Sequence, residues 1–273
     1  MALSKSKDYI LGTDRAELHR LGLQHQVWSS ETRHGWKLAE FSSGQHLLDL
    51  GCGPGYCTME MAYMVGEHGK VIGVDKSKAY IDFLKRNAKL HDLPIEAQCT
   101  DFMNMKLKDE SIDGAFSRWA LAWVDDVDEV IGKVADALVP GGAFVAQEYH
   151  GWSLLQTEPD FPNLTAAIAG ALKSFKSQKK AEIDIGRKLP ELFYDNGLEV
   201  TSIRPMTKLA TAEDLTWQWP KSFFQIYFPK VAEMGFLTKK QVKNALEELN
   251  ELEDTPGATI LCPHMIEVIG IKV

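Results

Sequence analysis

The sequence predicts an α/β fold built on a parallel, doubly wound sheet. Residues 47–55 read Leu-Leu-Asp-Leu-Gly-Cys-Gly-Pro-Gly, an apolar run that leads directly into a glycine-rich turn. Strands that are covered on both faces of a parallel sheet have nearly continuous apolar sequences of this kind. Short β-rich runs then alternate with helical patterns as far as residue 150. Such alternation is typical of a parallel sheet with helices on its two faces.

Each element of this alternation has its own signal. Apolar residues recur at helical spacing over 126–138, and Pro-Gly-Gly at 140–142 ends that helix. Thr238 and Gln241 have the spacing of a capping box, as do Asp14 and Glu17. The expected strands are 47–50, 71–75, 95–100, 114–117, 143–149, 198–204 and 264–273. The expected helices include 57–65, 77–90, 126–138, 164–179 and 186–196.

Two stretches interrupt the alternation, at about 151–184 and 211–257, and both contain helical patterns too long for simple connections. We expect residues 1–150 to contain N-terminal helices and the cofactor-binding half of the sheet. Residues 151–273 are expected to hold the rest of the sheet with the two helical insertions. The two parts together are predicted to form one structural domain.

Composition and sequence patterns argue against several classes of protein. The chain has 273 residues and a formal net charge of −8, which argues against a nucleic-acid partner. The N-terminus has no apolar signal-peptide region, and no apolar run is long enough to span a membrane. The cysteines form no metal-ligand cluster, so we expect no metal and interpret them as buried small hydrophobic residues of a reducing, cytoplasmic protein: Cys52, Cys57, Cys99 and Cys262.

The spacing of the glycines distinguishes this turn from a dinucleotide-binding turn. Gly51, Gly53 and Gly55 form G-x-G-x-G, and without side chains they let the backbone turn sharply and approach a ligand. A dinucleotide-binding turn has its third glycine one position later, where this chain has Tyr56. A nicotinamide-dependent oxidoreductase is therefore an alternative of lower rank.

Residues 47–55 resemble the first motif of the class I S-adenosylmethionine-dependent methyltransferases. The N-terminal run from Tyr9 to Trp28 resembles a subgroup of ubiquinone/menaquinone-type small-molecule methyltransferases. This resemblance covers most of the chain. It implies a Rossmann-like, mostly parallel sheet of seven strands with a helical cap, in which the N-terminal segment packs over the cofactor.

Acidic residues at three successive strand ends suit the chemical groups of S-adenosylmethionine. Asp49 can accept from the tail ammonium, and Asp75 can accept both ribose hydroxyls. Asp101 can accept from the adenine amino group while Phe102 packs on the ring. In the resembled family, Asp75 and the Asp101–Phe102 pair have these roles. The expected cofactor set also contains the three glycines and Lys76, Arg118, Trp119, Tyr9, Gln24 and Trp28.

The end of the fifth strand contains the candidates for a general base. Tyr149 and His150 can act on an acceptor, although methyl transfer does not require a base. Glu148 is interpreted as a structural acid, expected to form an ion pair with Arg118 because the two residues end neighbouring strands. Aromatic residues between Trp217 and Phe228 are expected to line an apolar acceptor site together with Trp28, Trp119, Tyr149 and His150.

These observations predict methyl transfer from S-adenosylmethionine to oxygen, carbon or nitrogen of a small, largely apolar organic molecule. The fourth strand ends in Ser117-Arg118-Trp119-Ala120 rather than the Asn/Asp-Pro-Pro-aromatic motif of many nucleic-acid methyltransferases. Three alternatives stay open: a methyltransferase acting on protein or RNA, a nicotinamide-dependent oxidoreductase, and a non-catalytic S-adenosylmethionine-binding regulator. The sequence does not indicate the oligomeric state.

Overall fold

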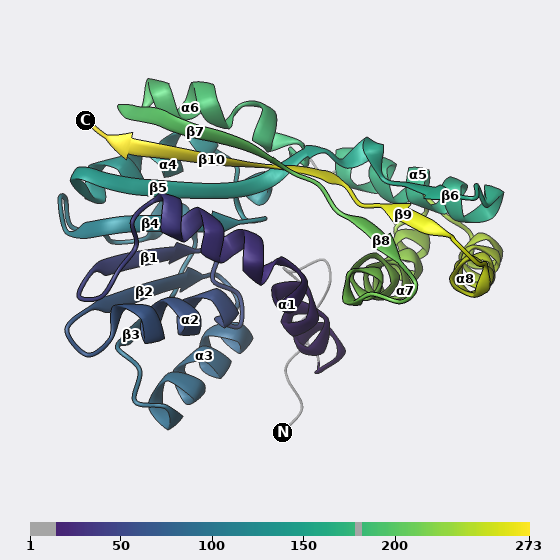
Figure 1. The fold of residues 1–273 in the computed structure, drawn as a ribbon, viewed down its shortest axis with the longest axis horizontal. Helices are drawn as coiled ribbons and strands as arrows, with labels where there is room; N and C mark the ends of the chain where they lie inside the picture. Colours follow the sequence, from purple (N-terminus) through teal and green to yellow (C-terminus); the bar gives the residue numbers. More distant parts are fainter. Residues whose placement is uncertain (1–14, 178–181) are drawn as a thin grey trace.

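The computed structural model describes residues 15–177 and 182–273, and within them the main sheet has seven strands (Figure 1). Neighbouring strands are parallel except that β10 runs antiparallel to both β5 and β7. In order across the sheet the strands are β3 (Ile95–Cys99), β2 (Lys70–Asp75), β1 (His46–Leu50), β4 (Ile112–Arg118), β5 (Leu138–Gly151), β10 (His264–Lys272) and β7 (Leu198–Met206). The predicted mostly parallel, seven-stranded sheet is confirmed.

The strand order reverses between β1 and β4. The chain proceeds from β1 to β2 and β3 on one side, and then returns to place β4 against the other side of β1. In open α/β sheets, the loops that leave the carboxyl ends of the strands separate at such a point and leave a crevice between them. The topology therefore places the glycine turn after β1 at the expected position for a ligand.

Helices cover both faces of the main sheet. On one face, Trp36, Phe41 and Met61 pack with Leu47 of β1 in an apolar core beneath α1 and α2, and Met59 of α2 packs near α3. On the other face, apolar residues of α4 and α6 pack on the sheet in a second core. The bounds of these helices are α1 (Arg15–Leu38), α2 (Tyr56–Val65), α3 (Lys78–Leu90), α4 (Val127–Ala137) and α6 (Leu189–Asp195).

The two insertions form a helical cap with its own apolar core, which includes Trp28 of α1. Figure 1 shows the long strands β5, β7 and β10 extending from the main sheet towards this cap. There a second, antiparallel sheet has the order β6-β9-β8. The cap consists of β6 (Gln156–Glu158), α5 (Pro162–Lys176), β8 (Leu209–Thr211), α7 (Gln218–Glu233), α8 (Lys239–Asp254) and β9 (Thr259–Leu261).

Local signals located the helices of the cap better than its strands. The predicted capping box is confirmed, because Thr238 and Gln241 exchange side-chain and backbone hydrogen bonds at the start of α8. The strands β6, β8 and β9 were not predicted, since three residues are too few to show the alternation that identifies a strand. The strand β5 begins at Leu138, before the Pro-Gly-Gly turn that was expected to precede it. Asp14 and Tyr9 lie outside the described residues.

Candidate functional site

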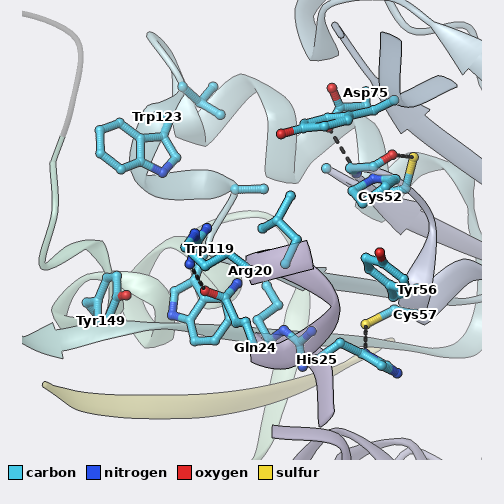
Figure 2. Close-up of a pocket in the computed structure, with 18 of the residues that line it drawn as sticks. Arg20, Gln24, His25, Cys52, Tyr56, Cys57, Asp75, Trp119, Trp123 and Tyr149 are labelled. Atoms are coloured by element: carbon cyan, nitrogen blue, oxygen red, sulfur yellow. Dashed lines mark hydrogen bonds between the residues drawn. The ribbon is translucent and has the colours of Figure 1, made fainter. Parts of the chain in front are cut away.

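A cavity of about 440 Å³ lies at the carboxyl ends of β1, β2 and β4 and continues beneath the cap. Figure 2 shows Asp75 and Cys52 on one side of it and Trp123 and Tyr149 on the other, with side chains of α1 between them. We call the two parts the strand-edge half and the aromatic half. The strand-edge half is lined by Asp49, Gly51, Gly53, Asp75, Lys76, Asp101 and Phe102. The aromatic half is lined by Trp119, Trp123, Tyr149, Trp152, Phe175, Trp219, Phe223, Phe224 and Tyr227.

The three glycines of the turn all have positive φ, but each serves a different purpose. Gly51 has φ 77°, and a Cβ there would lie closer than 3.0 Å to Cβ of Ala120. Gly55 has φ 90° at the start of α2, packs against Leu84 and does not line the cavity. Gly53, with φ 52°, borders the cavity, and a Cβ there would meet no atom within 4 Å. The turn therefore presents bare backbone to the cavity at Gly53.

Asp75 ends β2 and holds this turn in place. One carboxylate oxygen accepts from the N–H of Gly53 at 3.0 Å, and the other accepts from the N–H of Ser77 at 2.7 Å. Burial raises the pKa of Asp75, and the two backbone hydrogen bonds oppose that shift. Each carboxylate oxygen can accept a second hydrogen bond, so Asp75 can also receive donors from a ligand.

Asp101 and Phe102 follow β3 at the same edge and line the cavity with Lys76. Oδ1 of Asp101 accepts from the N–H of Met103 at 3.0 Å, which caps a short 3₁₀ helix. The side chain of Asp101 is exposed, while Phe102 is partly buried and packs against the core of the sheet. Both residues thus border the cavity, and adenine binding by them stays a prediction.

Asp49 lies at the base of the cavity, within β1, and is only 2% exposed. Its Oδ2 accepts from Oγ1 of Thr58 at 2.6 Å. Burial raises its pKa to about 6, although the Thr58 hydrogen bond and the positive charge of Arg118 both favour the carboxylate. A ligand cation beside Asp49 would lower that pKa again and be bound more tightly as the carboxylate ionises.

Several residues of α1 that line the cavity beside Gln24, among them Arg20 and His25, were not predicted. Arg20 forms a buried ion pair with Glu17 at 2.7 Å and donates to Oε1 of Gln24 at 2.9 Å. The same Gln24 oxygen accepts from Nε1 of Trp219 at 3.0 Å, which joins α1 to the cap. Glu17, Arg20 and Gln24 recur every three or four residues, and this polar stripe on one helix face was the available signal.

The predicted ion pair between Arg118 and Glu148 is wrong. Nη1 of Arg118 donates to Oγ1 of Thr32 at 2.7 Å, and its guanidinium lies 5.0 Å from the centre of the Trp119 ring. Glu148 instead accepts from the backbone N–H groups of Ala120 and Leu121. Successive side chains of a strand point to opposite faces, so ending neighbouring strands did not ensure that these two would meet.

Stacked rings line the aromatic half of the cavity. Trp119 lies between Tyr149 and Trp219, with ring centroids 5.9 and 5.7 Å away and interplanar angles of 29° and 21°. Beyond it, Phe175 stacks on Tyr227 with centroids 4.9 Å apart. The aromatic half is therefore a mostly apolar chamber built from the segment after β4, from β5 and from both insertions.

Other predicted residues lie behind or beside the cavity. Trp28 is fully buried and does not line it, but packs edge-on against Trp119 and Trp219. His150 does not line it either, and lies instead 5.3 Å from the ring of His264. Tyr149, the other predicted catalytic residue, does line the aromatic half. A strand that leaves the cavity at Tyr149 directs its next side chain elsewhere.

Three of the four cysteines are buried as predicted, but Cys99 is exposed. Cys57 lines the cavity with its Sγ 3.6 Å from Nδ1 of His25, whose other nitrogen lies 3.3 Å from Glu60. Burial raises the pKa of Cys57 to about 12. The thiol therefore stays protonated near neutral pH, and this contact does not make it a nucleophile.

Two negative findings concern residues 15–177 and 182–273. Among these residues no group of three or more histidine, cysteine, aspartate or glutamate side chains could hold a metal ion. No helix in these ranges combines the length and the apolar character that crossing a bilayer requires.

The sequence of this chain is similar to a methyltransferase domain and to several known proteins. A family model described as a methyltransferase domain matches residues 41–204. A demethylmenaquinone methyltransferase of Lactobacillus johnsonii is 28% identical over 62% of this chain and 75% of its own length. One of Symbiobacterium thermophilum is 32% identical over 44% of this chain and 49% of its own. An uncharacterised protein of a Streptomyces fradiae transposon is 32% identical over 61% and 47%. The chain spans about half the length of the last two relatives.

Solved structures show the same fold at low sequence identity. The YcgJ protein of Bacillus subtilis has a TM-score of 0.57 at 19% identity, covering 93% of this chain and 98% of that one. Geranyl diphosphate C-methyltransferase of Streptomyces coelicolor has a TM-score of 0.55 at 15% identity, covering 91% and 80%. The latter was solved with Mg²⁺, geranyl diphosphate and S-adenosyl-L-homocysteine.

Proposed function

Because the chain belongs to a methyltransferase-domain family of the class I, S-adenosylmethionine-dependent type, we propose that it methylates a small, largely apolar organic molecule. The observation that carries this proposal is that one cavity joins the glycine turn to the aromatic half. A methyl donor and an apolar acceptor need such adjoining chambers, since transfer requires the two reacting atoms to be held close together.

The strand-edge half fits the chemical groups of S-adenosylmethionine. Gly53 leaves backbone open to the cavity, and the half-buried carboxylate of Asp75 can accept the ribose hydroxyls. Asp101 and Phe102 suit the adenine, while Asp49 and Arg118 offer opposite charges to the amino-acid tail. When bound, the cofactor supplies an electrophilic methyl group, and the protein contributes binding, orientation and exclusion of water.

The aromatic half suits an acceptor with apolar rings or chains. Among residues 15–177 and 182–273, the lysines and arginines that line the cavity are Arg20, Lys76 and Arg118, and these three lie outside the cap insertions. The demethylmenaquinone methyltransferases among the relatives, named for a small-molecule substrate, support the same substrate class. Tyr149 lines the aromatic half and carries a hydroxyl that can orient the acceptor atom.

The alternatives fit the site less well. A nicotinamide site needs a glycine where Tyr56 stands, and the Tyr56 hydroxyl donates to the carbonyl of Leu18 in α1 at 2.9 Å. A protein or RNA acceptor would favour a basic rim, in contrast with the ring-lined chamber. A non-catalytic regulator would favour a cavity closed behind the cofactor, whereas this cavity continues beneath the cap.

The first test is calorimetric titration with S-adenosylhomocysteine and, separately, with NAD⁺. We expect binding of S-adenosylhomocysteine alone, and Asp75→Ala should weaken it about tenfold to a hundredfold, because a charged acceptor is lost. Asp82→Ala is the matched control, since Asp82 is an acid on α3 that pairs with Lys78 at the surface. Equal affinity in wild type and Asp75→Ala would contradict the assignment. Transfer of labelled methyl groups into fractionated metabolites would then identify the acceptor.

A further inference from the structure

The segment Trp119–Leu121, directly after β4, divides the two halves of the cavity. Trp119 has φ 54°, in the left-handed region that a bulky residue rarely adopts. Such a conformation is strained and persists only where the surroundings enforce it. The segment is therefore held in place by contacts that more than offset the strain.

Neighbouring residues of this segment contact opposite halves of the cavity. The ring of Trp119 stacks between Tyr149 and Trp219 in the aromatic half. The next residue, Ala120, packs so closely on Gly51 that a Cβ on that glycine would lie within 3.0 Å of it. A shift of the segment would thus move the wall of the acceptor chamber and the glycine turn at the same time.

Glu148 of β5 holds this segment from behind. Its side chain is fully buried, and Oε1 accepts from the N–H of Ala120 at 2.8 Å and of Leu121 at 2.9 Å. Its second oxygen, Oε2, is buried without a hydrogen-bond partner. Burial raises the pKa of Glu148 to about 8, so the carboxyl is mostly neutral near pH 7. Burying a carboxyl group with an unpaired oxygen costs more free energy than burying an apolar side chain of similar size. The presence of Glu148 in this core therefore needs an explanation.

We propose that Glu148 is a positioning residue for methyl transfer: by holding the backbone of Ala120 and Leu121, it sets Trp119 and Gly51 at the separation that the two substrates need. This inference rests on the proposed function, but its structural part does not. Glu148 touches neither half of the cavity directly, because it is absent from the lining. Its effect must therefore pass through the 119–121 backbone.

The test compares three variants at Glu148. Glu148→Gln keeps an oxygen that can accept from both N–H groups, Glu148→Asp withdraws the carboxyl by one methylene, and Glu148→Ala removes the acceptor. Phe193→Leu is the stability control, since Phe193 stacks on Phe144 in the core between the sheet and α6 and does not line the cavity. The measurements are affinity for S-adenosylhomocysteine and the circular-dichroism couplet of the stacked Trp119 and Trp219 indoles, assigned with Trp119→Phe.

We expect Glu148→Gln to retain the couplet and to bind within about threefold of wild type. Glu148→Ala and Glu148→Asp should lose much of the couplet and bind about tenfold more weakly, a loss equal to that of one good hydrogen bond. Phe193→Leu should retain both signals despite lower stability. An unchanged couplet and an unchanged affinity in Glu148→Ala would overturn the proposal. If Glu148→Ala does not fold, the same result in Glu148→Asp would overturn it. Failure of wild type to bind S-adenosylhomocysteine would instead contradict the proposed function, while the couplet would still report positioning.

Discussion

Gly35 of α1 lies directly against the carboxylate of Glu267 in β10, and a Cβ on this glycine would come closer than 3.0 Å to Oε2. Glu267 is fully buried and accepts from Nε2 of Gln147 at 2.6 Å and from Nε of Arg204 at 3.0 Å. Arg204 also pairs with Glu31 of α1 at 2.6 Å. This close approach fixes α1 on the sheet, and α1 in turn brings Arg20 and Gln24 to the cavity.

Gly35→Ala should therefore destabilise the protein, although alanine favours helices more than glycine does. Overpacking of a close contact costs about 1–3 kcal/mol, and here the crowded group is a buried carboxylate that cannot move without breaking its hydrogen bonds. Denaturant unfolding of wild type and variant measures the change.

A double-mutant cycle with Glu267→Ala identifies the cause. If the clash is with Glu267, Gly35→Ala should cost less in the Glu267→Ala background than in wild type, because the crowded carboxylate is gone. Equal costs in the two backgrounds would show that the contact between these residues is not responsible. Ser30→Ala, at an exposed position of the same helix, reports the effect of helix propensity alone.

Glu148 should make stability depend on pH. Its pKa in the folded protein is about 8, against an ordinary 4.5, so the folded state binds a proton that the unfolded state releases between these values. Stability from this group is therefore complete below about pH 4.5, declines as pH rises towards 8, and levels off above that. Glu148→Gln has no such proton, so the stability difference between variant and wild type should change by a few kcal/mol from pH 5 to pH 9. Parallel pH profiles would contradict this expectation.

Tyr149 and His150 should differ in their effect on turnover. Tyr149 lines the aromatic half, whereas His150 lies beside His264 and Arg187, outside the cavity lining. His150→Ala should leave kcat and KM within about twofold of wild type, and Tyr149→Phe should raise KM for the acceptor by about fivefold to tenfold, because one orienting hydrogen bond is lost. A large loss of kcat in His150→Ala, with the fold intact, would restore the histidine as a base.

The cap helix α8 should depend on its capping box. Thr238→Ala leaves the N–H of Gln241 without its side-chain acceptor and should cost about 1 kcal/mol of stability. Thr238→Ser retains the hydroxyl and is the matched control. If the alanine and serine variants unfold at the same denaturant concentration, the box contributes little to the cap.

The sequence by itself determined the sheet, its order of elements and the edge at which the cavity lies. These features depend on local patterns: an apolar strand before Gly51, and acids at strand ends such as Asp75 and Asp101. Such patterns act within a few residues, and a parallel sheet brings the ends of neighbouring strands together without further information. Even the capping box of α8 was evident, because both of its partners lie within one turn of helix.

Only the tertiary structure decided which side chains face one another across the site. Arg118 pairs with Thr32 rather than Glu148, Trp28 supports Trp119 from behind, and the α1 residue Arg20 reaches the cavity. These contacts join residues far apart in the chain. Which side chains meet depends on small rotations and register shifts, and no local sequence pattern indicates these. Burial also determines the protonation state of side chains. The packed surroundings of Glu148, and not its neighbours in sequence, raise its pKa.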